Sequence, residues 1–293
     1  MPTPETATPA PAGVIHDIGY QRYQGVRLGR GYVVGSLYAH SLRTAFGLGR
    51  SAKAKIFPWL IVGIVAVVAA VLAAIRAQLG QMPLSYAQFP QTLILLILLF
   101  CAVVAPELVS RDLHSGVLPL YFARPLRRGD YALAKWGALA TAAFLMLAGP
   151  LTLMFAAIAF TLDDLGAVWR EFGDFAPGLA YLAIHAVVFS AVALLVASLV
   201  KRRAVAAGAI VGVFLLTTPV VGVLSVLPSR TANQLAGLAS PATLVGGVGD
   251  WLFESSGDLG IGDFGPLYGL VTLALVVTCV ALLLARYRKV AAQ

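Results

Sequence analysis

Six long apolar stretches constrain the fold of this chain more than any other feature of its sequence. An α-helix crosses the hydrocarbon core of a bilayer with roughly 20 apolar residues. Such stretches occupy about 57–75, 89–105, 132–162, 177–200, 204–227 and 266–285. Only 12% of the 293 residues are charged, whereas a soluble domain carries about 25%. The sequence therefore predicts an all-α integral membrane protein with six transmembrane helices in one domain, over residues 56–293.

The charged residues are distributed unevenly between the loops, which indicates how the chain crosses the membrane. With six spans of alternating direction, 18 of the 21 Lys and Arg residues fall on one side and three, Arg76, Arg170 and Arg230, fall on the other. Eight of the 13 acidic residues lie on that second side. Because cytoplasmic loops carry an excess of Lys and Arg, we expect a multi-pass plasma-membrane protein with both termini in the cytoplasm. This asymmetry accounts for the net charge of +8 without a nucleic-acid partner.

The region before the first span has two parts. Residues 1–31 predict a cytoplasmic N-terminal arm, and its first 13 residues, rich in Pro, Thr and Ala, are predicted to be disordered. From Tyr32 to Leu48 apolar side chains recur at helical spacing, at Val34, Leu37, Tyr38, Leu42, Ala45 and Phe46. This pattern predicts an interfacial amphipathic helix and linker over 32–55. An ordinary solvated helix is the alternative.

The segment 228–265, between the fifth and sixth spans, is too long to be a simple turn. Its middle is apolar, but Ser240-Pro241 and four glycines interrupt it. Irregular backbone at membrane depth needs a covering of protein or a water-filled cavity. We therefore expect short re-entrant extracellular helices here, dipping into the outer leaflet.

Small residues recur in the fifth span, where Ala204, Gly208 and Gly212 are four positions apart. Such spacing lets two helices approach closely. It predicts a helix-packing or dimer interface, although the general frequency of glycine in spanning helices explains it as well.

Few residues suited to chemistry lie within the apolar stretches. His185 is the one clear ionisable residue deep in a span, and a hydrogen bond to a neighbouring helix explains it as well as an ion pathway does. Asp163 and Asp164 fit a charge cap on the outer face better than a metal site. Cys101 and Cys279 are expected to be inert thiols. The sequence has no Gly-x-x-x-x-Gly-Lys-Ser/Thr motif for ATP. We therefore expect no catalytic residue, no bound cofactor and no metal on this chain.

The stretch from Glu107 to Lys135 is the longest charged, turn-containing segment between two apolar stretches. Ser110–Leu120 can form a short helix across the membrane face, limited by Gly116 and Pro119. A short helix held at the surface by two spans is a rigid knob that can dock in a groove of a soluble protein. An ordinary positively charged loop is the alternative.

The order of residues in this stretch resembles that in the membrane subunits of type-2, exporter-class ABC transporters. The shared pattern is a Glu, a Gly, an Arg-Pro pair followed by basic residues, and then a Tyr and a Lys at the start of a long span. The layout over about residues 30–290 is also similar. The resemblance implies an ATPase-coupling loop made by Glu107, Arg111, Asp112, Gly116, Arg124, Pro125, Arg127, Arg128, Tyr131 and Lys135, in which Ser110–Leu120 is the cytoplasmic coupling helix.

The resemblance further implies a permease subunit of an exporter rather than an enzyme. Two separate ATPase subunits would bind ATP and Mg and dock on the 107–135 loop, and a second permease copy or a sister permease would complete a homodimer or heterodimer. The second and fifth spans, expected to line the pathway, are almost wholly apolar. They favour efflux of a hydrophobic or amphipathic substrate (a drug, antibiotic or lipid-like molecule) across a bacterial plasma membrane. Two alternatives stay open: an intramembrane lipid-modifying enzyme that uses Asp163, Asp164 and His185, and a non-transporting membrane scaffold.

Overall fold

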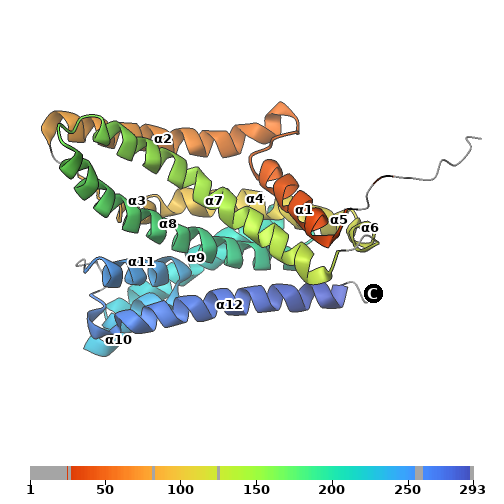
Figure 1. Cartoon of the computed structure of the whole chain (residues 1–293). Coiled ribbons are helices and arrows are strands. Elements are labelled where there is room, and N and C mark those ends of the chain that lie inside the picture. Colours follow the sequence, from red (N-terminus) through yellow and green to blue (C-terminus); the bar gives the residue numbers. More distant parts are fainter. Residues whose placement is uncertain (1–24, 26–27, 81–82, 124–125, 255–259, 291–293) are drawn as a thin grey trace, which may run out of the picture.

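The computed structural model describes residues 25, 28–80, 83–123, 126–254 and 260–290, which are helical almost throughout and include no β-strand (Figure 1). The α-helices are α1 (Arg30–Ala45), α2 (Ala52–Leu79), α3 (Phe89–Thr92), α4 (Ile94–Leu108), α5 (Ser110–His114), α6 (Leu118–Phe122), α7 (Arg128–Ala159), α8 (Leu165–Leu199), α9 (Arg203–Ser225), α10 (Arg230–Leu235), α11 (Pro241–Leu252) and α12 (Gly265–Val290). Two 3-10 helices, η1 (Ala236–Ala239) and η2 (Gly262–Phe264), complete the order. Most of the predicted N-terminal arm lies outside the described residues, as do Arg124 and Pro125 of the predicted loop.

Six helical segments are long and apolar enough to cross a membrane. They are Ala52–Leu79, Ile94–His114, Arg128–Ala159, Leu165–Leu199, Arg203–Ser225 and Gly262–Lys289. They lie along one common direction in Figure 1. The predicted six-span, all-helical architecture of a multi-pass membrane protein is thus confirmed for the part of the chain that the structure describes.

Helix α8 is longer than the expected fourth span. It begins at Leu165, twelve residues before the expected start at 177. The Asp164 side chain caps it by accepting a hydrogen bond from the Gly166 amide, and such a cap stabilises a helix start. Phe175 then stacks on Phe155 of α7, with ring centres 4.6 Å apart. The charged first third of α8 therefore stays helical because a cap and α7 support it.

The second span differs in the opposite sense, because it starts later than expected. The stretch predicted to begin at 89 is divided between α3 and α4 at Leu93, whose backbone leaves the helical region. Continuous helix therefore begins at Ile94, and the short α3 stands as a separate turn before it.

Helices α4, α7 and α8 form the centre of the bundle. In their most apolar parts 61%, 50% and 67% of the residues are buried, against 33%, 22% and 22% in α2, α9 and α12. The second, third and fourth spans are thus surrounded by protein, and the other three present most of their apolar surface outward.

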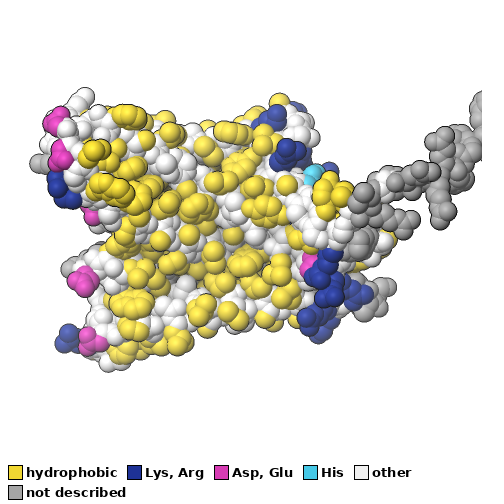
Figure 2. Space-filling view, viewed as in Figure 1, with side chains coloured by type: hydrophobic (Ala, Val, Ile, Leu, Met, Phe, Trp, Pro, Cys, Tyr) yellow, Lys and Arg dark blue, Asp and Glu magenta, His cyan; other side chains and the backbone are white. Residues whose placement is uncertain are grey.

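Charged side chains separate to the two ends of the bundle (Figure 2). A wide band of hydrophobic side chains lies between an end where Lys and Arg gather and an end where Asp and Glu predominate. We name these the basic end, where α2 and α9 begin and α12 finishes, and the acidic end, where α8 and α12 begin. The basic end is the one that the charge distribution predicts to be cytoplasmic.

Helix α1 lies at the basic end and packs on protein through its apolar side. Leu37, Ser41 and Ala45 are buried at four-residue intervals, and the Tyr38 hydroxyl donates a hydrogen bond to Thr141 of α7 over 2.9 Å. The apolar face of the predicted amphipathic helix therefore contacts the bundle itself. A position of α1 at a membrane surface stays a prediction.

A tight turn joins α1 to α2. Gly47 adopts a φ of 68°, and a Cβ at this position would lie 2.6 Å from the carbonyl oxygen of Ala54. Both the left-handed backbone and the close approach require glycine. The turn holds the end of α1 directly against the beginning of α2.

The segment between α9 and α12 folds back toward the bundle. Ser240, just before α11, is fully buried and accepts a hydrogen bond from Thr217 of α9 over 2.9 Å. Because Thr217 precedes the last residue of α9 by eight positions, α11 starts about 12 Å below that helix end. The Tyr181 hydroxyl of α8 then donates to the Val245 carbonyl over 2.9 Å. The position of this segment in the outer leaflet stays a prediction.

Glycines let α11 fit closely between aromatic side chains. A Cβ on Gly247 would lie 2.3 Å from the ring of Tyr268 in α12, and one on Gly249 would lie 2.4 Å from the Tyr181 hydroxyl. Tyr268 also donates a hydrogen bond to the Gln234 carbonyl of α10 over 2.8 Å. The glycines that interrupt this segment in the sequence thus serve as contact points.

Candidate functional site

The loop between α4 and α7 folds into two short helices, α5 and α6. The prediction of a single helix over Ser110–Leu120 is therefore wrong. Helix α5 ends at His114, and Gly116 follows with a φ of 66°, a conformation that favours glycine. Helix α6 then begins at Leu118 with Pro119 in its first turn, a position that proline accepts well.

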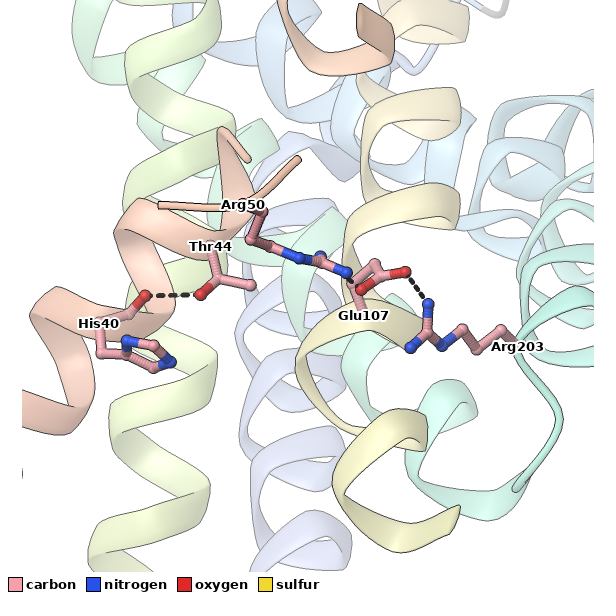
Figure 3. A network of polar contacts seen from close by, with 5 residues as sticks. All are labelled: His40, Thr44, Arg50, Glu107 and Arg203. Carbon is pink, nitrogen blue, oxygen red and sulfur yellow. Dashed lines mark hydrogen bonds and ion pairs between the residues drawn. The ribbon is translucent and has the colours of Figure 1, made fainter. Parts of the chain in front are cut away.

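Glu107, near the end of α4, joins three elements of the basic end (Figure 3). Arg50, in the turn after α1, donates to Glu107 Oε2 over 2.6 Å, and Arg203, in the first turn of α9, donates to Oε1. The Glu107 side chain is only 22% exposed, so water weakens these charge-assisted bonds only in part. In the same view the Thr44 hydroxyl donates to the His40 carbonyl within α1. Glu107 thus ties the start of α9 and the α1–α2 turn to α4.

Asp112 of α5 binds two side chains of α7. Lys135 Nζ lies 2.9 Å from Asp112 Oδ2, and the Tyr131 hydroxyl donates to the same oxygen over 2.7 Å. Lys135 is 4% exposed and Tyr131 is fully buried. The ammonium also lies 5.4 Å from the centre of the Tyr131 ring, within the range of a cation–π contact. Because a buried ammonium is costly without an opposite charge, Asp112 fixes α5 against α7.

The Tyr131 ring connects α7 to two further helices. Its centre lies 5.6 Å from that of Tyr121 and 6.2 Å from that of Phe122, both in α6, and 5.1 Å from that of Tyr287 in α12. Edge-to-face contacts at such distances stabilise aromatic pairs. Tyr131 therefore sits where α5, α6, α7 and α12 meet.

The last turn of α8 receives hydrogen bonds from two neighbours. Ser110, buried at the start of α5, donates to the Ala197 carbonyl over 2.9 Å, and Arg286 of α12 donates to the Ser198 carbonyl over 3.4 Å. The final carbonyls of a helix have no partner within the helix. α5 and α12 thus supply bonds that hold the end of α8.

The start of α7 is also held by charged side chains. Asp130 accepts the Arg127 amide over 3.1 Å and two bonds from Arg30 of α1, over 2.6 and 2.5 Å. Arg128 donates to the Arg288 carbonyl of α12 over 2.8 Å. These contacts join α1 and α12 to the point where the loop ends.

The outermost part of the loop is exposed. Arg111, His114 and Gly116 face outward, and the Leu120 side chain is 71% exposed. We call residues 114–120 the loop tip. A leucine this exposed, at the tip of a loop, suits a contact with another molecule better than it suits water.

Five charged residues whose side chains take part in this cluster were missed by reasoning from the sequence: Arg30, Arg50, Asp130, Arg203 and Arg286. Their partners lie far away in the chain; Glu107 is 57 positions from Arg50 and 96 from Arg203. One signal was available, because Glu107, Asp112 and Asp130 are acids on a strongly basic side and each therefore needed a cation. The sequence did not tell which cation each would find.

The small residues of α9 have no packing partner within the described chain. A Cβ on Gly208 or Gly212 would meet no atom within 4 Å outside the helix itself and its sequence neighbours, and Ala204 is exposed. They do not mediate contact with another described helix of this chain. Their role in a dimer interface stays a prediction.

The residues of the enzyme alternative are not brought together. His185 is fully buried, with Nδ1 3.2 Å from the Tyr181 carbonyl and Nε2 3.1 Å from Gln91 Oε1. It is thus hydrogen-bonded to its own helix and to α3. Asp164 caps α8, about 30 Å from His185 along the helix axis. Within the described residues, no three His, Cys, Asp or Glu side chains are grouped so as to hold a metal ion.

A buried carboxylate at the acidic end was also missed. Glu171 of α8 accepts a hydrogen bond from the Tyr86 hydroxyl over 2.7 Å and lies 3.7 Å from a guanidinium nitrogen of Arg76. Burial, and then the bond to Glu171, raise the pKa of Tyr86 well above its ordinary value. Tyr86 therefore keeps its proton and joins the α2–α3 connection to α8.

No protein-family model matches the chain, and no curated protein sequence matches it.

Proposed function

We propose that this chain is the permease subunit of an ATP-driven exporter of the type-2 ABC class, with separate ATPase subunits that dock on the loop between α4 and α7. One observation carries the proposal. The loop and the end of α4 that leads into it are bonded to three other long helices: Glu107 of α4 to the start of α9, Asp112 of α5 to α7, and Ser110 of α5 to α8. A force on the loop would reach all of them.

In this proposal, ATP binding closes two ATPases and moves the α5–α6 pair against the bundle. Because Asp112 holds α5 to Lys135 and Tyr131, α7 moves with it, and α4 moves because it runs almost directly into α5. ATP has to bind one conformation more tightly than the other, since a ligand without such a preference shifts no equilibrium. Two permeases working together would then open toward alternate sides of the membrane.

The substrate would be hydrophobic or amphipathic. Helix α4 is mostly buried but keeps a narrow open face, on which Leu95 is 56% and Val103 37% exposed. Nearby α9 exposes Leu215 and Leu216, at 56% and 76%. A pathway lined by these faces offers few partners to a hydrophilic ion and suits a drug, an antibiotic or a lipid-like molecule.

A second permease would pack beside α9. Gly208 and Gly212 leave open space on this helix, where a helix of an identical or sister subunit could approach closely. The α10–α11 segment would sit in the outer leaflet above the pathway, with both termini and the loop tip in the cytoplasm of a bacterium.

The test is capture of the ATPase at the loop tip. Leu120→Cys places a thiol on the exposed tip, while the native Cys101 and Cys279 are buried. Cross-linking in native membranes, followed by mass identification, should yield a soluble P-loop protein at about one copy per permease. Thr161→Cys, exposed at the acidic end, is the matched control and should yield none.

A loop-tip variant sharpens the result. Leu120→Asp should abolish co-purification of the P-loop protein while the permease elutes unchanged in gel filtration, because the side chain makes little contact with the bundle. If Leu120→Cys captures no P-loop protein in native membranes, at low or high salt, the permease proposal fails.

A further inference from the structure

The carboxylates of the basic end are all engaged, which leaves some of its cations without acidic partners. Among the described residues this end holds Glu107, Asp112 and Asp130, and each is bonded to an Arg or Lys. Three other cations, Arg43, Lys53 and Lys55, are exposed. None of the three forms an ion pair with a described residue. Their charges are available to an anion from outside the chain.

These three cations lie in adjoining segments at one corner of the molecule. Arg43 lies in the last turn of α1, and Lys53 and Lys55 lie in the first turn of α2. The Gly47 turn closes the two helices against each other, since a Cβ there would reach the Ala54 carbonyl and the Lys55 amide at 2.6 and 2.9 Å. Figure 2 shows Lys and Arg atoms gathered at the beginning of α2. We call this group the α1–α2 corner.

An exposed apolar stripe continues directly from the corner along α2. Lys53 shares one helix face with Ile56, Leu60, Ile64, Val67 and Val71, at spacings of three and four residues. Ile56 is 63% exposed, Leu60 is 56% exposed and Val67 is 63% exposed. No polar residue interrupts this stripe after Lys53. The charge and the apolar surface therefore form one continuous feature.

An aromatic residue marks the boundary between the two parts. Trp59 lies one turn beyond Lys55 on the adjacent face of α2 and is 51% exposed. Its ring centre is 6.3 Å from that of Phe46 at the end of α1. Trp is enriched where the hydrocarbon of a bilayer meets the headgroups. Its place between cations and aliphatic side chains matches that boundary.

We propose that the α1–α2 corner binds an anionic phospholipid in the leaflet next to the basic end. The phosphate and headgroup contact Arg43, Lys53 and Lys55, and the acyl chains lie along Ile56, Leu60 and Ile64. Basic residues near a membrane surface attract anionic lipid with about 1 kcal/mol each. An acidic soluble protein could meet the cations but not the apolar stripe below them, so a lipid is the occupant that fits both. This inference rests on the membrane-spanning helices and not on the proposed transport function.

The test is lipid binding measured by native mass spectrometry in detergent. The probes are dioleoyl phosphatidylglycerol and dioleoyl phosphatidylcholine, which share acyl chains and differ in headgroup charge. The unmodified chain should bind phosphatidylglycerol at least about tenfold more tightly. The variant Arg43→Gln/Lys53→Gln/Lys55→Gln should lose this preference and keep its affinity for phosphatidylcholine.

A matched control removes equal charge elsewhere at the basic end. The variant Lys201→Gln/Arg202→Gln/Lys289→Gln also loses three exposed cations and should keep the preference. If both triple variants lose it equally, net charge explains the binding and the corner is not a lipid site. The proposal is equally overturned if the corner variant keeps the preference, or if it binds lipid normally but loses a co-purifying soluble protein. The single variant Lys53→Glu, at an exposed position without an ion pair, repeats the measurement with minimal change to the fold.

Discussion

Two regions of the bundle, the basic end and the α11 segment, are held by different kinds of contact. At the basic end, Glu107, Asp112 and Asp130 connect five long or loop helices through ion pairs. At the acidic end, α11 is held mainly by close fit, with Gly247 against the ring of Tyr268 and Gly249 against Tyr181. The Tyr181 hydroxyl also donates to the Val245 carbonyl of α11.

This contrast has consequences for movement. Partly exposed ion pairs can exchange one partner for another or for water at modest cost, so elements joined by them can shift and rejoin. A tyrosine ring packed directly against a glycine backbone has no comparable alternative partner, because close-packed interiors resist small displacements. We therefore expect the contacts of the basic end to rearrange while α11 keeps its position. Four experiments, in decreasing order of expected effect, test this difference.

The largest effect is expected at the Asp112–Lys135 pair, the most deeply buried ion pair among the described residues. Lys135→Met leaves the Asp112 carboxylate, only 13% exposed, without its cation, and should lower the free energy of unfolding by about 3 kcal/mol. Chemical unfolding in detergent, followed by Trp fluorescence, measures it. The double variant Asp112→Leu/Lys135→Met should recover at least half of the loss. Arg111→Gln, exposed on the same helix, should change stability by less than about 0.5 kcal/mol; equal effects of Lys135→Met and Arg111→Gln would contradict the assignment.

The next effect should appear at the acidic end. Gly247→Ala places a methyl group 2.3 Å from a ring carbon of the fully buried Tyr268, and overpacking of this kind costs about 1–3 kcal/mol. The same unfolding measurement detects it. Gly63→Ala in α2 is the control, since its added methyl meets no atom within 4 Å. If Gly247→Ala is as stable as Gly63→Ala, α11 is not packed rigidly against Tyr268.

A smaller effect is expected at Glu107, because its carboxylate is partly exposed to water. Glu107→Gln weakens the bonds to Arg50 and Arg203 but leaves an amide that can still accept one of them, so we expect a loss of about 1 kcal/mol. Thermal unfolding in detergent gives the value. Glu107→Ala should lower the free energy of unfolding more than Glu107→Gln does. If neither variant lowers it, Glu107 does not stabilise the packing of α9 and the α1–α2 turn on α4.

The smallest effect is expected from added salt, which should affect the basic end and not α11 of the same molecule. Raising salt from 0.05 to 1 M shortens the screening length from roughly 14 to 3 Å, which weakens exposed pairs such as Arg30–Asp130 and leaves steric contacts unchanged. Amide hydrogen exchange should therefore speed up at the starts of α7 and α9, and not in α11. Equal acceleration in both regions would remove the proposed distinction.

The sequence predicted the helices better than their ends. The apolar stretches located all six spans because burial in lipid needs a continuous run of apolar residues. The start of α8 was placed twelve residues late, since Arg170, Glu171 and Asp174 interrupt that run. The cap at Asp164 is a local contact, but the partners of Glu171, Arg76 and Tyr86, become visible only once the end of α2 lies beside α8. The single helix expected over Ser110–Leu120 failed for a local reason, the left-handed turn at Gly116.

The role of the loop residues in coupling to an ATPase stays a prediction. Glu107, Asp112, Tyr131 and Lys135 were selected from their order in one loop, and the structure brings the last three into direct contact. Their long-range partners, such as Arg203 for Glu107, could not be deduced, because which loops become neighbours is a property of the assembled bundle. Arg124 and Pro125 stay predictions, since they lie outside the described residues.

The length of α8 carries a final consequence. Its 35 residues span about 52 Å, far more than the roughly 30 Å of a hydrocarbon core. Tilting does not bring the whole of α8 into the hydrocarbon core, because spanning helices rarely tilt beyond about 40°. Part of this helix therefore extends beyond the lipid. Pro177 lies inside α8, and an interior proline removes a backbone hydrogen bond and kinks a helix. The 22 residues after Pro177 form a rod of about 33 Å, and turning it by about 5° carries its far tip through about 3 Å. A displacement at Ser110, applied to one end of this rod, would reach the Pro177 bend, where the charged first third of α8 can change its angle.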